Sequence, residues 1–149
     1  MVDREGVGGW LEGPGRRREP EEGEYAGSRL GLPESGAGSV ATFGRRFGAV
    51  LIDWLACLLI ARAFTSNPWL PLAIFTGESA VLISTLGSTF GMRLLGLRVV
   101  PLEAPRLLPP ARVLLRTVLL VLVIPAVVWD RDGRGLHDRL AGSAVVRAR

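Results

Sequence analysis

Lysine is absent from this sequence. All 18 basic residues are arginines, so mechanisms that need a lysine amine are excluded, including a Schiff base and the phosphate-binding P-loop. Other reactive side chains are almost as scarce, since the chain has one cysteine, Cys57, and one histidine, His137. A disulfide framework and a cysteine-based zinc site cannot form, and a Ser-His-Asp triad would depend on that single histidine. We therefore expect no enzyme activity, no cofactor and no metal.

Charge divides the chain into two parts. Residues 1–43 hold five arginines and eight acidic residues, a net charge of −3, whereas the remainder holds 13 arginines and six acidic residues, a net charge of +7. A pI near 10.8 would suggest nucleic acid for a soluble protein, but the basic stretches lack the aromatic platforms that stack on bases. The arginines instead flank or interrupt apolar runs. Retention of cytoplasmic loops by the positive-inside rule explains them better, and no nucleic-acid partner is expected.

The first 43 residues are rich in glycine, proline and charge, and they show no helical or strand period. This composition predicts a disordered tail, which we place in the cytoplasm. The first apolar run starts near residue 47, beyond the usual reach of a secretory signal peptide, so none is expected.

Three apolar runs follow the tail: Phe47–Phe64, Trp69–Leu86 and Val113–Trp129. About 17–25 mostly apolar residues are needed to cross a bilayer, so we predict transmembrane helices at 47–66, 69–87 and 111–129. The turn at residues 65–68 makes the first two an antiparallel hairpin with its outer ends in the cytoplasm. A soluble bundle is the alternative, but neither of the first two runs shows the polar stripe of a soluble helix.

The sequence does not decide whether the third run crosses the membrane, because the run contains Arg116 and Pro125 and has arginines on both sides. It either crosses the membrane or re-enters on the same side by bending near Pro125. Short strands are predicted at Leu97–Val100 and Ala144–Val146, which could pair if both are cytoplasmic. The expected fold class is thus an all-α membrane protein, a helical hairpin plus a third transmembrane or re-entrant helix, with short cytoplasmic β segments.

Two carboxyl groups lie within the predicted spans. A carboxyl inside a membrane is costly and needs a partner. Asp53 follows Arg46 by seven residues, which places both on one face of a helix about 10.5 Å apart along the axis. Glu78 in the second run lies at a depth similar to that of Asp53. The two carboxyls could share a proton or a cation, or they could serve only to orient and pack the helices.

Three blocks of the sequence, RRFGAVLID, GSTFGMRLLGLRVV and GLHDRLAGSAVV, together resemble the RDD family of small bacterial membrane proteins, named for one arginine and two aspartates. The resemblance covers residues 44–149 and assigns the arginine to Arg46, the first aspartate to Asp53 and the second to Asp138. It implies a multi-pass protein of the bacterial inner membrane, and the arginines that flank the hairpin predict an N-terminus in the cytoplasm. Met92 stands where the family usually has a lysine, which weakens any role for a basic pair.

The resemblance implies no more about function than transport of ions or small ligands. The candidate functional cluster contains Arg46, Asp53, Glu78, His137 and Asp138. The first hypothesis is transport through Asp53 and Glu78, and the alternative is a membrane scaffold or assembly factor in which an arginine–aspartate pair fixes helix packing. A domain of this size cannot enclose a transport pathway alone. Besides the lipid bilayer, we therefore expect a homo-oligomer or a membrane-protein partner.

Overall fold

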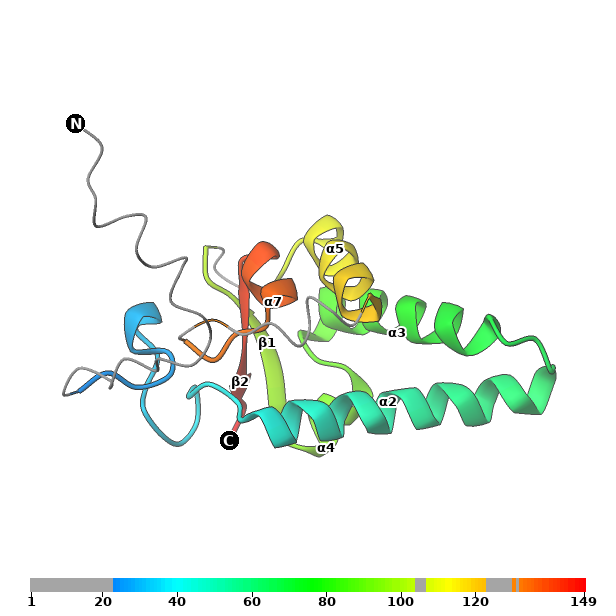
Figure 1. The fold of residues 1–149 in the computed structure, drawn as a ribbon, viewed down its shortest axis with the longest axis horizontal. Helices are drawn as coiled ribbons and strands as arrows, with labels where there is room; N and C mark the ends of the chain where they lie inside the picture. Colours follow the sequence, from blue (N-terminus) through cyan, green and yellow to red (C-terminus); the bar gives the residue numbers. More distant parts are fainter. Residues whose placement is uncertain (1–22, 104–106, 123–129, 131) are drawn as a thin grey trace, which may run out of the picture.

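The computed structural model describes residues 23–103, 107–122, 130 and 132–149. Within these residues the fold is mostly helical, with five α-helices and one two-stranded sheet. The two longest helices, α2 (Phe43–Phe64) and α3 (Leu70–Leu86), extend side by side from the rest of the structure and are joined at its far end (Figure 1). The predicted helical hairpin is therefore present.

Helix α2 starts at Phe43, four residues before the predicted span, and ends at Phe64. Its buried residues recur every three or four positions and so form one face of the helix: Arg46, Ala49, Asp53, Cys57 and Ala61. The remaining faces carry large apolar side chains that protrude from the structure, and Leu59 and Phe64 are 72% and 81% exposed. At about 33 Å long, α2 is the one helix in the described residues that is long and apolar enough to cross a membrane.

Helix α3 begins after a turn that its own side chains stabilise. Asn67 Oδ1 accepts a hydrogen bond of 2.9 Å from the Trp69 backbone N–H, and Pro71 suits the first turn because its missing N–H has no partner there anyway. Gly87 ends the helix with a φ of 71°, a left-handed conformation that glycine adopts without a steric cost. At 17 residues α3 is apolar but shorter than α2.

The predicted β segments form an antiparallel pair. Strand β1 (Leu97–Pro101) and strand β2 (Ser143–Arg147) pair with Leu97 opposite Arg147 and Val99 opposite Val145. The five-residue helix α4 (Phe90–Leu94) leads into β1 and packs on α2. The similarly short α7 (Leu136–Leu140) leads into β2.

Part of the segment that we expected to be disordered adds to this sheet. Residues 1–22 lie outside the described residues, but Val40 forms a β-bridge with Val146, and the Ala41 backbone N–H donates to the Val145 carbonyl at 2.9 Å. Ala41 is also buried in the core. Apolar residues beside an unpaired strand edge explain this order, since β2 pairs with β1 on its other side. The order thus begins before the predicted boundary at residue 43.

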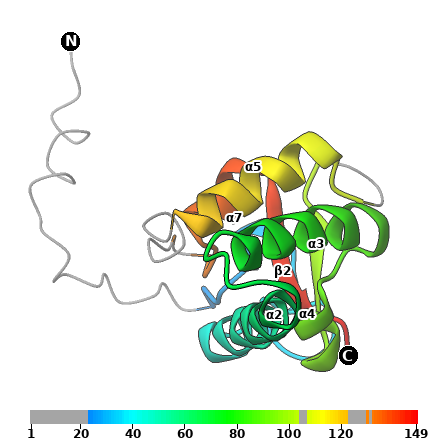
Figure 2. The same ribbon diagram turned by 90° about the vertical axis from the view of Figure 1, so that its right-hand side faces the viewer.

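Helix α5 (Pro110–Val121) covers the first part of the third apolar run and packs on α3, which lies between α5 and α2 (Figure 2). Residues 123–129, including Pro125, lie outside the described residues. The prediction of a crossing or a re-entrant third helix therefore remains a prediction. The core lies where the helices meet the sheet and contains Ala49, Ile83, Met92, Leu97, Val99, Val113 and Val145.

Candidate functional site

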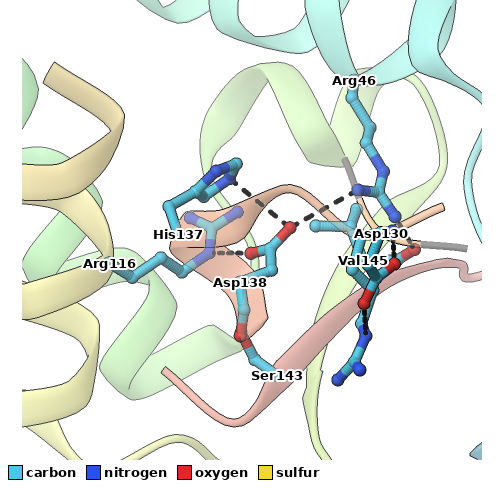
Figure 3. Close-up of polar contacts among 8 residues, drawn as sticks. Arg46, Arg116, Asp130, His137, Asp138, Ser143 and Val145 are labelled. Carbon is cyan, nitrogen blue, oxygen red and sulfur yellow. Dashed lines mark hydrogen bonds and ion pairs between the residues drawn. The ribbon is translucent and has the colours of Figure 1, made fainter. Parts of the chain in front are cut away.

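Asp138 is the centre of a cluster of buried charges. Its carboxylate is 0% exposed and accepts a hydrogen bond of 2.6 Å from Arg116 Nε to Oδ1. Arg46 Nη1 and His137 Nε2 each lie 3.4 Å from the other oxygen, Oδ2 (Figure 3). We call these four residues the Asp138 cluster. Because a buried carboxylate is costly unless it is paired, the two arginines explain how Asp138 can be buried.

Four elements bring the Asp138 cluster together. Arg46 comes from α2, Arg116 from α5, and His137 and Asp138 from α7. Strand β2 contributes backbone, because Arg46 Nη2 donates to the Val145 carbonyl at 3.1 Å. Ser143 Oγ donates to the Asp138 carbonyl at 3.3 Å and so ties α7 to the start of β2. The cluster therefore joins α2 and α5, through their arginines, to α7 and strand β2.

The electrostatic environment favours the ionised form of Asp138. Burial by itself would raise the pKa of this carboxyl, but the charges of Arg116, His137 and Arg46 outweigh burial and hold the pKa below its usual range. Asp138 is thus a carboxylate at neutral pH, and its negative charge offsets one of the two arginines.

Asp53 belongs to a different group. The residue is 2% exposed. Its carboxylate accepts hydrogen bonds from Thr89 Oγ1 at 2.5 Å and from the Gly91 backbone N–H at 2.6 Å. Thr89 in turn accepts a hydrogen bond from the Met92 N–H at 3.3 Å, the usual role of an N-cap residue. Asp53 therefore holds the start of α4 against α2.

Glu78 reaches the same place from α3. Its Oε1 accepts a hydrogen bond of 3.5 Å from the Phe90 backbone N–H, and its Oε2 accepts one of 3.4 Å from Cys57 Sγ. The carboxyls of Asp53 and Glu78 thus converge on neighbouring N–H groups at the start of α4. We call Asp53, Glu78, Cys57, Thr89 and Gly91 the Asp53 cluster.

The structure divides the five predicted site residues between these two clusters. Arg46, His137 and Asp138 lie together, and Asp53 and Glu78 lie together. Arg46 and Asp53 do share the buried face of α2, but the Arg46 guanidinium contacts Asp138 and Val145, while Asp53 binds Thr89 and Gly91. Arg46 therefore pairs with Asp138 on a distant segment and not with Asp53 two turns along its own helix.

A cavity of about 410 Å³ adjoins the Asp138 cluster. All four members of the cluster line one part of it. Apolar side chains line the rest, mainly from α2, α3 and α5, and they include Phe47, Val50, Trp54, Phe75 and Leu120. The volume is within the range of small-molecule sites, about 300–1,000 Å³. An apolar cavity beside buried arginines can bind a molecule, whereas paired and hydrogen-bonded carboxylates mainly hold elements together.

Sequence reasoning missed Arg116 and the two partners of Asp53. Arg116 was treated only as an interruption of the third apolar run, although the rule that singled out Asp53, a charge within an apolar helix, applies equally to it. Thr89 and Gly91 had a weaker signal, a threonine followed by a short helical stretch.

Residues 69–142, about half of the chain, match the family model described as RDD family. No curated protein and no solved structure matches the chain closely enough to be compared. The matched range includes Glu78, Arg116, His137 and Asp138 and begins after α2, so Arg46 and Asp53 lie outside it. The match covers the second of the three sequence blocks and most of the third, and the chain belongs to the RDD family.

Proposed function

We propose that this chain is a multi-pass protein of the cell membrane, with α2 and α3 inserted as a hairpin. The observation that supports insertion is the outward apolar surface of these helices, where large side chains such as Leu55, Leu59, Phe64 and Val81 are exposed. Surfaces of this kind are rare and unfavourable in water but suit contact with lipid. The two backbones satisfy their own hydrogen bonds as helices, as lipid requires.

The distribution of arginines supports a cytoplasmic location for the outer ends of the hairpin, together with the N-terminus and the β-sheet. Arg45 precedes the apolar part of α2, and Arg93 and Arg98 follow α3, whereas the other end of the hairpin carries one arginine, Arg62. Cysteine accessibility in whole cells tests this in a Cys57→Ser background. A cysteine at Ser66 should react with a membrane-impermeant maleimide, and one at Arg98 should react only after lysis. The reverse pattern would contradict the orientation.

Within the membrane, the function that the geometry supports best is non-catalytic: a scaffold or assembly module whose helix packing is set by the Asp138 cluster. The observation that carries this proposal is that one fully buried carboxylate contacts arginines from α2 and α5 and belongs to a third element, α7. Such a contact fixes the relative positions of three segments, and a homo-oligomer or membrane-protein partner would be built on that fixed surface.

Transport of a proton or monovalent cation is the second candidate. It is favoured by the convergence of Asp53 and Glu78, two carboxyls from neighbouring helices, at the start of α4. Against it, both carboxyls accept hydrogen bonds from backbone N–H groups and so act as caps. A single chain of this size would need an oligomer or a partner to form a complete pathway.

Reconstitution into liposomes separates the two candidates. The scaffold proposal expects cation-driven proton flux no greater than that of empty liposomes, for the parent and for Asp53→Asn alike. Flux that disappears in Asp53→Asn and Glu78→Gln, with insertion and oligomer size unchanged, would overturn it in favour of transport. Glu103→Gln is the matched control, because this carboxylate is exposed and lies outside both clusters.

A further inference from the structure

The cavity next to the Asp138 cluster has two chemically different parts. Its floor consists of Arg46, Arg116, His137 and Asp138, and its walls are apolar and include both aromatic and aliphatic side chains. Along α2 the floor begins at Arg46 and the walls continue to Trp54, eight residues further and so about 12 Å deeper along the helix axis. Trp54 also packs edge-on against Phe75 of α3, with ring centroids 5.8 Å apart, which closes the wall between the two helices.

Arg116 presents unused hydrogen-bond donors at this floor. A guanidinium has five N–H groups, and Arg116 uses its Nε–H on Asp138. Its terminal nitrogens, Nη1 and Nη2, have no partner among the residues that the structure describes, although the side chain is only 3% exposed. Because Arg116 lines the cavity, these donors are available to a molecule bound there, and a guanidinium is a strong and geometrically selective site for an anion.

The charges at the floor also favour an anion. Two arginines share the Asp138 carboxylate there. Of the nearby carboxylates, Asp130 acts electrostatically on Arg46 and is paired with Arg134, whereas Arg116 has Asp138 as its ion-pair partner among the described residues. A carboxylate or phosphate near the Arg116 terminal nitrogens would therefore meet a guanidinium that shares its carboxylate with a second arginine.

We infer that this cavity binds an amphiphile with one anionic head group, a carboxylate or a phosphate, and an alkyl tail. The head would accept hydrogen bonds from Arg116, and the tail would lie between Phe47, Trp54 and Phe75. This order matches a lipid in a bilayer, with the head near the end of the helix and the tail toward its middle. The site rests on the proposed membrane location for its supply of ligand, but not on the scaffold role.

Quenching of Trp54 fluorescence by a brominated tail tests the site directly. The full chain in neutral detergent is titrated with stearate brominated in mid-chain and, separately, with the methyl ester of the same acid. The acid should quench in a saturable way and the ester should bind at least about tenfold more weakly, since it lacks the charge. Trp54→Phe identifies the signal, because three other tryptophans are present. Equal quenching by acid and ester would overturn the proposal.

Two variants and one control locate the binding. Val50→Phe fills the cavity next to the charged floor, and Leu51→Phe introduces the same side chain at the neighbouring exposed position, which does not line the cavity. We expect binding to fall about tenfold or more in Val50→Phe and to be unchanged in Leu51→Phe. Arg116→Lys keeps the charge but loses the planar fork, and should also weaken binding. Parent-like binding in Val50→Phe would overturn the site even if the arginine variant fails to fold.

The source of the amphiphile is found by repeating the measurement in nanodiscs. Brominated phosphatidylglycerol that quenches Trp54 more than brominated phosphatidylcholine identifies a membrane lipid as the ligand. Quenching by added bromostearate alone identifies a free fatty acid. Absence of selective quenching by either anion overturns the proposal, and since the assay does not measure topology or flux, this result is distinct from a failure of the proposed function.

Discussion

Arg116 Nε lies 2.6 Å from Asp138 Oδ1, and neither side chain is more than 3% exposed. This contact joins α5 to α7, and the same carboxylate reaches Arg46 on α2. Where a buried ion pair has both partners, replacing it with apolar groups is often tolerated, but removing one partner leaves an uncompensated charge. The effects of substitutions in the Asp138 cluster therefore depend on which partner is removed.

Asp138→Asn should be one of the most destabilising polar substitutions in the chain. It leaves Arg46 and Arg116 buried without their counter-charge, a cost of about 3–5 kcal/mol. We expect a marked fall in the thermal unfolding midpoint in detergent, and cleavage by protease between α7 and β2 that the parent resists.

The matched control is Glu103→Gln, which removes an exposed carboxylate paired with Arg112 at 3.2 Å. Exposed pairs contribute about 0–1 kcal/mol, so its unfolding midpoint should stay close to that of the parent. A similar midpoint for Asp138→Asn and Glu103→Gln would contradict the central role of the Asp138 cluster.

The free energy of unfolding should fall at acid pH because Asp138 becomes protonated. Because the pKa of Asp138 is lower in the folded state than in the unfolded state, its contribution is fully present above the unfolded value, about 3.9, and is lost as pH falls through the folded value. Acid titration of the unfolding midpoint should therefore show a steeper loss below about pH 4 for the parent than for Asp138→Asn. Parallel titration curves for the two proteins would show that another carboxyl is responsible.

Gly91→Ala should separate α4 from α2. An added Cβ would overlap the Ala49 carbonyl oxygen, and backbone atoms cannot move aside as a flexible side chain can. We expect loss of stability, with a lower midpoint and weaker protection of amides in α4. Gly77→Ala is the internal control, since a Cβ there meets no atom within 4 Å and alanine is the better helix former. If both variants behave alike, close packing at Gly91 is not important.

Asp53→Leu should speed hydrogen exchange of the backbone amides at the start of α4. The substitution keeps the size of the side chain but removes the acceptor for Thr89 and Gly91, leaving buried donors that cost about 1–3 kcal/mol each. Asp53→Asn should cost less, because its amide oxygen can still accept from Gly91. Hydrogen exchange at Gly91 measures the difference, and equal exchange in the parent and both variants would show that Asp53 does not act as the cap.

The sequence predicted the elements better than the contacts between them. Apolar runs of adequate length identified α2 and α3, and short β-branched segments identified β1 and β2. Asp53 and Arg46 were placed correctly on one helix face, but spacing along a helix only shows which residues could meet. The pairing of Arg46 with Asp138 joins positions 92 residues apart, and no local pattern carries that information. The family resemblance grouped these residues without saying which of them touch.

The start of α4 shows a second reason why the sequence did not predict these contacts. Helix α4 has five residues, too few for a hydrophobic period, so only Thr89 signalled its start. Its position depends on Asp53 from α2 and Glu78 from α3, which contact it after the hairpin has formed. Likewise, the order at Val40 and Ala41 comes from the free edge of β2, so composition alone predicted disorder there.

The contacts of the Asp138 cluster also determine the order in which the fold can be completed. Asp138, the partner of both arginines, and Val145, a second partner of Arg46, come later in the chain than Arg46 and Arg116. Synthesis proceeds from the N-terminus, so α2 leaves the ribosome before its counter-charge exists. The charge cluster can therefore form only after residue 138 has been made, and a nascent chain truncated before that residue would carry Arg46 and Arg116 without their carboxylate, which makes it a ready substrate for quality control.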